Sequence, residues 1–277
     1  MACPSVRSTM PSTFRTVFAS FPMAWPATRE TLAPGAPGRV ISISELKTRC
    51  SNCSMRELCL PVGLDASVLK EVDRLVTDRK RLDKGAAVYR AGDPFSALYA
   101  IRLGSCKTAL LAEDGREQVA GYHMIGEIIG LDGIATERHA CQVTALEDTE
   151  VCVIPFTQLE DLARRFPSLQ HNLHQFLSRE IGRDQSMMLL LGNMRADERL
   201  AAFLLSLSDR YHQHGYSATE FVLRMTREEI GSYLGLKLET VSRLLSRFQS
   251  KGLLQVRGRE LKLLDMSVLK QLAGRSC

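Results

Sequence analysis

The chemistry in this chain is concentrated in residues 50–59, which read CSNCSMRELC. Three thiols this close together can share one metal site. Tetrahedral zinc and an iron–sulfur cluster both accept four thiolates, so a fourth must come from another part of the chain. The three clustered cysteines are Cys50, Cys53 and Cys59, and the candidates for the fourth position that we consider are Cys106, Cys141 and Cys152.

The first 40 residues bear on the compartment in which these thiols act. They contain six of the ten prolines, no acidic residue before Glu30 and no secretory signal pattern. We therefore predict a disordered extension over residues 1–40 and a reducing, cytoplasmic location, where clustered cysteines bind metal or do redox work. A start codon assigned too early and an organellar transit peptide are the alternatives.

The net charge of +5 lies in the last third of the chain. Residues 195–277 hold 14 Lys and Arg against 9 Asp and Glu, so the remainder is neutral. A basic terminal module on a neutral body predicts a polyanionic partner. An uninterrupted apolar run of roughly 18 residues is absent, so no membrane span is expected.

Residues 225–254, MTREEIGSYLGLKLETVSRLLSRFQSKGLL, predict a helix-turn-helix. Thr226 and Glu229 have the spacing of a capping box, so a helix is expected to begin there. Gly235 can take the positive φ of a tight turn, and a second helix is expected from about 238 to 250. In such a motif the second helix enters the major groove of DNA. The alternative is a pair of amphipathic helices without a DNA-binding role, because any such pair joined at a glycine gives the same pattern.

The second helix carries side chains suited to reading DNA. Arg243 can bond guanine, Glu239 can accept from cytosine, and the hydroxyl of Ser242 tolerates several bases. Arg247, Lys251 and Arg257 are expected at phosphates, which set the register on the duplex but do not read its sequence. The two apolar runs about Arg257-Gly258-Arg259 predict a hairpin that would form a wing.

The elements before this domain are predicted from periodicity. From Arg79 to Phe156, short apolar runs alternate with glycine, which is typical of an antiparallel β domain. Residues 167–191 have helical spacing and predict one long helix. Its apolar seam contains one carboxylate, Asp184, and such a seam is a natural dimer interface. The seam residues that we expect to govern dimerisation are Ile181, Asp184, Met187 and Met188.

The predicted fold class is α+β. We expect a cysteine segment over 41–62, a β-roll over 63–165, a dimerisation helix over 166–193 and a winged helix-turn-helix over 194–277. A nucleotide- or flavin-binding glycine loop and an assignable nucleophile–base pair are both missing from the sequence, so an enzyme is not expected.

Six segments together resemble the CRP/FNR superfamily of bacterial transcription regulators, in its FNR branch of oxygen-sensing iron–sulfur proteins. The resemblance covers roughly residues 45–275, and its carriers are CSNCSMRELC, LYAIRLGS, VCVIPF, GRDQSMMLLL, ERLAAFLLSLS and MTREEIGSYLGLKLETVSRLLSRFQ. It implies a [4Fe–4S] cluster on Cys50, Cys53, Cys59 and Cys152. Zinc bound by the same thiols, or a redox switch among them, is the alternative function.

The resemblance also implies a homodimer on palindromic TTGAT-type sites, read by Glu239, Ser242 and Arg243. Loss of the cluster to oxygen would return the chain to a monomer, because two Asp184 carboxylates in one seam repel each other. The family further implies that the loop Leu111–Glu117 contacts RNA polymerase. Lys237 departs from the family pattern, because that position usually holds a capping Ser or Thr.

A cyclic nucleotide is not expected as a ligand. Relatives that bind one follow a Gly-Glu turn with an Arg-Ser or Arg-Ala pair at a fixed spacing. Here the turn is present at Gly126 and Glu127, but Arg138 is followed by His139 and the spacing is one residue longer. We therefore expect Gly126 and Glu127 to act as turn residues.

Overall fold

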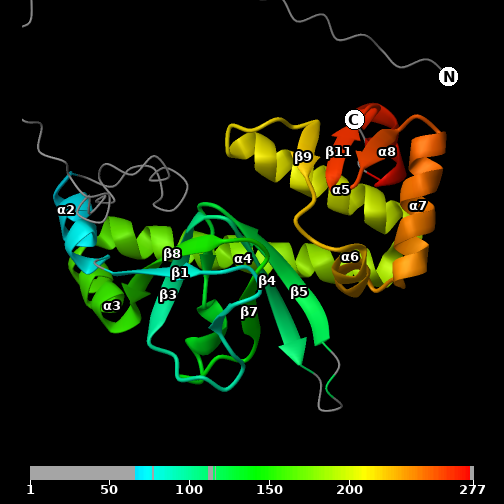
Figure 1. Cartoon of the computed structure of the whole chain (residues 1–277). Helices are drawn as coiled ribbons and strands as arrows, with labels where there is room; N and C mark the ends of the chain where they lie inside the picture. Colours follow the sequence, from blue (N-terminus) through cyan, green and yellow to red (C-terminus); the bar gives the residue numbers. More distant parts are fainter. Residues whose placement is uncertain (1–65, 77, 112–114, 116, 275–277) are drawn as a thin grey trace, which may run out of the picture. The chain divides into compact units, whose positions relative to one another are not determined.

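The computed structural model describes residues 66–76, 78–111, 115 and 117–274 (Figure 1). Cys50, Cys53 and Cys59 lie outside these residues, as does most of the loop between Leu111 and Glu117. Within the described residues, each helix is either too short or too polar to cross a lipid bilayer.

Two four-stranded antiparallel sheets form the predicted β-roll. The first sheet has the order β1 (Asp78–Leu82), β8 (Thr149–Pro155), β3 (Ala97–Leu103) and β6 (Ile128–Ile129). The second has the order β2 (Ala87–Tyr89), β7 (Gln142–Ala145), β4 (Ser105–Leu111) and β5 (Glu117–Met124). Ile101 and Val151 of the first sheet share a buried apolar cluster with Cys106 and Val143 of the second. Alternating apolar residues thus build the core of the roll, as the sequence predicted.

Short helices accompany the first sheet. Helix α2 (Ala66–Leu75) and α3 (Phe156–Arg165) bury Val68, Val72 and Leu162 in one cluster with Leu98 of β3. A single 3₁₀ turn, η3 (Leu131–Gly133), follows β6. Helices α2 and α3 were not predicted, because ten residues hold fewer than three helical turns and give little periodic signal.

The predicted long helix is present as α4 (Pro167–Asn193), with Pro167 in its first turn. A proline fits there because the first N–H groups of a helix have no partner within the helix. Helix α5 (Ala196–Gln213) follows after two residues and begins the C-terminal domain. It buries Leu200, Leu204 and Leu205, which are fully inaccessible, in the core of that domain.

The C-terminal domain is a winged helix-turn-helix, drawn from yellow to red in Figure 1. Its helices after α5 are α6 (Arg227–Leu234), α7 (Leu238–Ser250) and α8 (Met266–Leu272). The predicted hairpin is formed by β10 (Leu254–Arg257) and β11 (Glu260–Leu263), and β9 (Glu220–Val222) pairs with β11 as a third strand. The α+β fold class is confirmed. Strand β9 was not predicted, because three residues are too few for a periodic signal.

Candidate nucleic-acid interface

The turn between α6 and α7 is fixed by local chemistry. The Glu229 amide donates to Thr226 Oγ1 at 3.1 Å, and the Thr226 amide donates to Glu229 Oε2 at 2.7 Å, which is the predicted capping box. Gly235 ends α6 in the left-handed region at φ 63°. A Cβ on Gly231 would lie 2.6 Å from the carbonyl oxygen of Leu236, so only glycine allows this close approach. These contacts set the angle at which α7 leaves the turn.

Helix α7 has one buried face and one exposed face. The buried face packs into the domain core through Val241, Leu244, Leu245 and Phe248. Glu239 and Arg243 are exposed, and Ser242 is half-buried. Arg227 Nη1 lies 3.3 Å from the hydroxyl of Ser242 and can donate to it. The three predicted base-reading side chains therefore lie on α7 away from its core face, and Arg227 orients one of them.

The predicted phosphate contacts lie at the C-terminal end of α7 and on the wing. Arg247 is exposed on the last turn and forms an ion pair with Asp197 of α5 at 3.3 Å. Lys251, directly after the helix, and Arg257, at the end of β10, are exposed as well. Lys237 is the N-cap residue and makes no side-chain capping bond within the described part of the chain. This agrees with the expectation that lysine cannot cap a helix.

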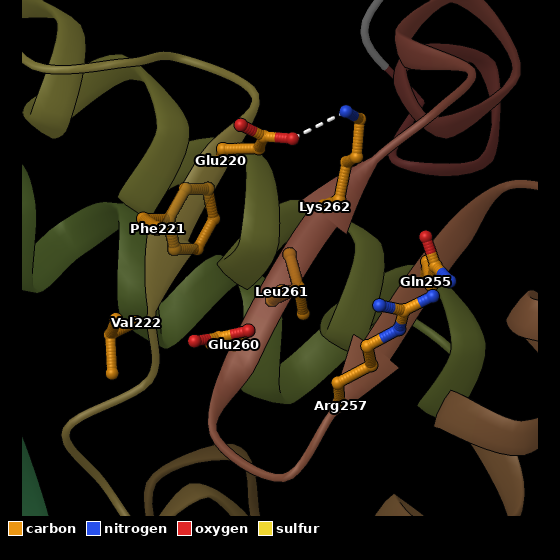
Figure 2. Close-up of a pocket in the computed structure, with 8 residues that line it drawn as sticks. All are labelled: Glu220, Phe221, Val222, Gln255, Arg257, Glu260, Leu261 and Lys262. Atoms are coloured by element: carbon orange, nitrogen blue, oxygen red, sulfur yellow. Dashed lines mark ion pairs between the residues drawn. The ribbon is translucent and has the colours of Figure 1, made fainter.

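The wing sheet carries a shallow groove that holds charges of both signs (Figure 2). Glu220 of β9 and Lys262 of β11 form an ion pair across it. Arg257 and Glu260, which pair in the hairpin register, line the same groove. Phe221 and Leu261 of the same two strands are buried in the core of the domain. Arg257, the phosphate contact predicted on the wing, is thus exposed at the edge of this groove.

Cys152 is the one predicted cluster ligand among the described residues. It lies on β8, pairs in register with Arg79 of β1 and Ala100 of β3, and is half-buried. It packs against the apolar cluster to which α2 contributes Val68 and Val72. Helix α2 begins seven residues after Cys59. Seven residues of fully extended chain reach at most about 25 Å. The cysteine segment is therefore tethered to the helix that shares a cluster with Cys152.

Cys106 and Cys141 have different surroundings. Both are buried, at 0% and 5% exposure, in the cluster between the two sheets. Burial raises the pKa of the Cys106 thiol to about 12. Burial and the nearby carboxylate of Asp132, which accepts from Cys141 Sγ at 3.1 Å, raise the pKa of Cys141. Both thiols thus lie between the sheets, in a cluster separate from the one that Cys152 and α2 share.

The seam of α4 is exposed in the single chain. Ile181 is 58% and Met188 73% exposed, Asp184 is exposed beside them, and Met187 is half-buried. At 3.6 residues per turn, Ile181, Asp184 and Met188 project within about 60° of one another. Three of the four seam residues predicted to govern dimerisation thus form one compact stripe of two apolar side chains and a carboxylate. Leu189, 62% exposed on the same helix, was not predicted.

Glu127 does more than form a turn. Gly126 does adopt the left-handed conformation, at φ 84°, but the Glu127 side chain is only 12% exposed and is bound by two arginines. Arg210 of α5 donates to both carboxylate oxygens at 2.7 and 3.1 Å, and Arg183 of α4 lies 3.6 Å away. Burial pushes the Glu127 pKa upward, but the charges of Arg210 and Arg183 outweigh this and hold it below its ordinary value. Burial also lowers the pKa of the neighbouring His123 to about 4, so that imidazole is neutral at pH 7.

A second contact joins the roll to α6. Lys107 Nζ of β4 lies 2.7 Å from Glu117 of β5 and 3.1 Å from Glu229 of α6. The amide of Val119 donates to Ser232 Oγ at 2.9 Å. Because β5 is an edge strand, one side of it has no neighbouring strand to accept its amide hydrogen bonds, and Ser232 of α6 supplies an acceptor there. Sequence reasoning missed these residues, and the basic and acidic members are too far apart in the chain to form a local pattern.

Comparison with known proteins agrees with this architecture. Residues 79–166 match the model of the cyclic nucleotide-binding domain, and residues 198–272 match the Crp-like helix-turn-helix domain. The transcriptional regulatory protein btr of Bordetella pertussis is 48% identical over 240 residues, which are 86% of this chain and 99% of btr. The fumarate nitrate reduction regulatory protein of Klebsiella oxytoca is 44% identical over 82% of this chain and 91% of its own length. The structure of FixK2 from Bradyrhizobium japonicum superposes with a TM-score of 0.67 at 31% identity, covering 72% of this chain and 98% of FixK2. The chain therefore belongs to the CRP/FNR family of transcription regulators.

Proposed function

We propose that this regulator is an oxygen-responsive homodimer that binds palindromic TTGAT-type DNA sites while it holds a [4Fe–4S] cluster. The ligands would be the thiolates of Cys50, Cys53, Cys59 and Cys152. The cluster itself would be the oxygen-sensitive group, because oxygen would destroy it. Names of relatives, such as the fumarate nitrate reduction regulatory protein and the anaerobic regulatory protein of Aggregatibacter actinomycetemcomitans, support a role in anaerobic gene control.

The observation that carries the proposal is the position of Cys152. Its thiol is half-buried, on a β-strand whose register fixes it, and shares an apolar cluster with α2. A thiol in this position can share a metal centre with the cysteine thiols of the segment just before α2. Cys106 and Cys141, in contrast, are enclosed between the sheets. Four cysteine thiolates are what a [4Fe–4S] cluster requires.

The dimer would form along the exposed stripe of α4. Burying Ile181 and Met188 against a second copy removes apolar surface from water, which favours association. Asp184 opposes it, because two carboxylates near the twofold axis repel each other. Such a dimer is close to balance, so a modest bias from the sensor region can shift the population between monomer and dimer.

DNA reading would follow from the exposed face of α7. A dimer presents two such helices to half-sites about one helical turn apart, which matches a palindrome. Glu239, Ser242 and Arg243 would read base edges, while Arg247, Lys251 and Arg257 would contact phosphates.

Two further expectations complete the proposal. A cyclic nucleotide is not expected, since the Glu127 carboxylate already accepts from Arg210. The loop Leu111–Glu117 is proposed to contact RNA polymerase, and residues 112–114 and 116 of it lie outside the described chain. We expect the protein to act in the bacterial cytoplasm, where the DNA lies.

The test is to purify the full chain without oxygen and record its visible absorbance, iron content and sedimentation before and after exposure to air. A broad visible absorption is expected from thiolate-bound iron. Air should bleach it, and the dimer and the affinity for a TTGAT palindrome should be lost together.

Two matched cysteine variants make the test specific. Cys152→Ser should abolish the absorption and the dimer, whereas Cys141→Ser should keep both, because serine can still donate to Asp132. A colourless protein with stoichiometric zinc would retain the DNA-binding function and rule out the proposed sensing. Equal effects of the two variants would rule out the proposed ligand set.

A further inference from the structure

Arg199 occupies the joint between the dimerisation helix and the DNA-binding domain. It lies in the first turn of α5, and its guanidinium donates to three backbone carbonyls. Nε bonds the oxygen of Met194 at 2.8 Å and Nη2 bonds that of Leu191 at 2.8 Å, both at the end of α4. Nη1 bonds the oxygen of Leu234 at 3.0 Å, at the end of α6. One side chain therefore holds the ends of two helices.

The chemistry of helix ends explains why an arginine fits this place. The last carbonyls of a helix have no partner within the helix and carry partial negative charge, so a cation there is favourable. The guanidinium presents five N–H donors in a rigid fork and can serve several acceptors at once, whereas an ammonium is a compact point charge. Arg199 thus joins α4 to α6 through geometry as well as through charge.

The same joint is tightly packed. A Cβ on Gly235, the residue that turns the chain from α6 toward α7, would lie 3.3 Å from Arg199 Nη1 and 3.6 Å from Leu191 Cδ2. Leu190 and Met194 of the α4 end and Leu236 of the turn pack against one apolar cluster. Helix α7 begins at Leu238, three residues after Gly235. The position of α7 is therefore tied to the end of α4 through a few short links.

We propose that Arg199 is a positioning residue that sets the distance between the two recognition helices and hence the half-site spacing that the dimer accepts. The inference rests on the proposed dimer along α4. In that dimer the twofold axis lies at α4, so a displacement at the joint occurs in both subunits and is doubled between the two copies of α7. Half-sites separated by about 34 Å, one turn of DNA, tolerate little such error.

The experiment uses the full chain, purified without oxygen, as wild type, Arg199→Gln, Arg199→Lys and one control variant. Fluorescence anisotropy gives the affinity for duplexes with two TTGAT half-sites at the spacing that wild type prefers, for duplexes with one base pair inserted or removed, and for a single half-site. Sedimentation measures dimerisation of the same samples. Arg195→Gln is the matched control, because Arg195 lies at the same joint but pairs within the first turn of α5, with Glu198 at 2.7 Å.

Wild type and Arg195→Gln should prefer the native spacing by about ten-fold or more, which corresponds to ~1.4 kcal/mol. Arg199→Gln should reduce this preference to about two-fold while its dimerisation and single-half-site affinity stay within about two-fold of wild type. Arg199→Lys should lie between, since it keeps the charge but loses the fork. The ratio between duplexes is the deciding quantity, because partial unfolding lowers the affinity for every duplex alike.

An unchanged spacing preference in both Arg199 variants would overturn the inference. So would an equal loss on all duplexes, which would assign Arg199 to folding alone. A failure of the proposed function looks different: wild type itself would then be monomeric or indifferent to spacing. If Arg199→Gln does not fold, the Arg199→Lys ratio alone decides the matter in the same way.

Discussion

Helices α4 and α7 are both amphipathic, but only one of them is completed by its own chain. Val241, Leu244, Leu245 and Phe248 of α7 are at most 7% exposed beneath the rest of the domain. Ile181, Met188 and Leu189 of α4 are each more than half exposed. These exposed side chains are the surface that the proposed dimer would bury. The comparison teaches that helical periodicity alone does not distinguish a face that packs within the chain from one that stays exposed on it.

The prediction with the largest expected effect on stability removes apolar side-chain atoms from each helix in turn. Phe248→Ala should lower the free energy of unfolding by about 3–5 kcal/mol, because it leaves a cavity in the core. Met188→Ala, at 73% exposure, should change it by no more than about 0.5 kcal/mol. Urea unfolding at concentrations where the chain is monomeric measures both. A similar cost for the two variants would mean that α4 is part of the monomer core and that the comparison is wrong.

The inner side of α4 provides the next test, because Arg183 lies 3.6 Å from the carboxylate of Glu127 there. Glu127→Gln should destabilise the chain by about 3 kcal/mol at pH 7, since Arg210 and Arg183 lose their counter-charge. The folded-state pKa of Glu127 lies below its ordinary value, so its stabilisation is present above that value and is lost as the pH falls through the folded-state pKa.

The measurement is urea unfolding of wild type and Glu127→Gln from pH 7 down to pH 3. Other acids with lowered pKa values, such as Glu150, act in both proteins, so the difference between the two curves isolates Glu127. That difference should shrink toward zero on acidification. A difference that is constant with pH would show that the carboxylate charge of Glu127 does not stabilise the fold.

Two substitutions on the exposed side of α4 should change the strength of dimerisation, by smaller free energies and in opposite directions. Asp184→Ala should strengthen dimerisation, because two facing carboxylates at about 4 Å cost roughly 1–4 kcal/mol between the limits of bulk water and a protein surface. Ile181→Ala should weaken it through the loss of buried apolar area. Sedimentation equilibrium without oxygen measures both association constants. Effects of the same sign would place Asp184 outside the interface.

Sequence reasoning succeeded where the determining contacts are local. The capping box of Thr226 and Glu229, the turn at Gly235 and the bounds of α7 depend on residues a few positions apart. It failed where partners are distant: Glu127 and Arg210 are 83 positions apart, and each is unremarkable alone. The proposal of Cys152 as the fourth ligand depended on the family resemblance for the same reason, because the residues next to Cys152 in the sequence do not show which strands it pairs with.

The smallest predicted effect concerns the start of α7, the weakest point of a helix that is otherwise complete. Lys237 is its N-cap residue, in the extended conformation that a capping serine would also adopt, at φ −75° and ψ 150°. In Lys237→Ser, the new hydroxyl can accept from an amide in the first turn, so the free energy of unfolding should rise by about 0.5–1 kcal/mol.

The same substitution separates the two roles open to this lysine. If Lys237 contacts a phosphate, the slope of log affinity against log salt concentration should fall by about 1 in Lys237→Ser. Lys251→Ser is the matched control: it removes the same charge at the other end of α7, where a cation favours the helix carboxyl end. It should therefore give no gain in stability. A gain in stability with an unchanged salt slope would mean that Lys237 only occupies a capping position, and recognition would then depend on the exposed face of α7 beyond its first residue.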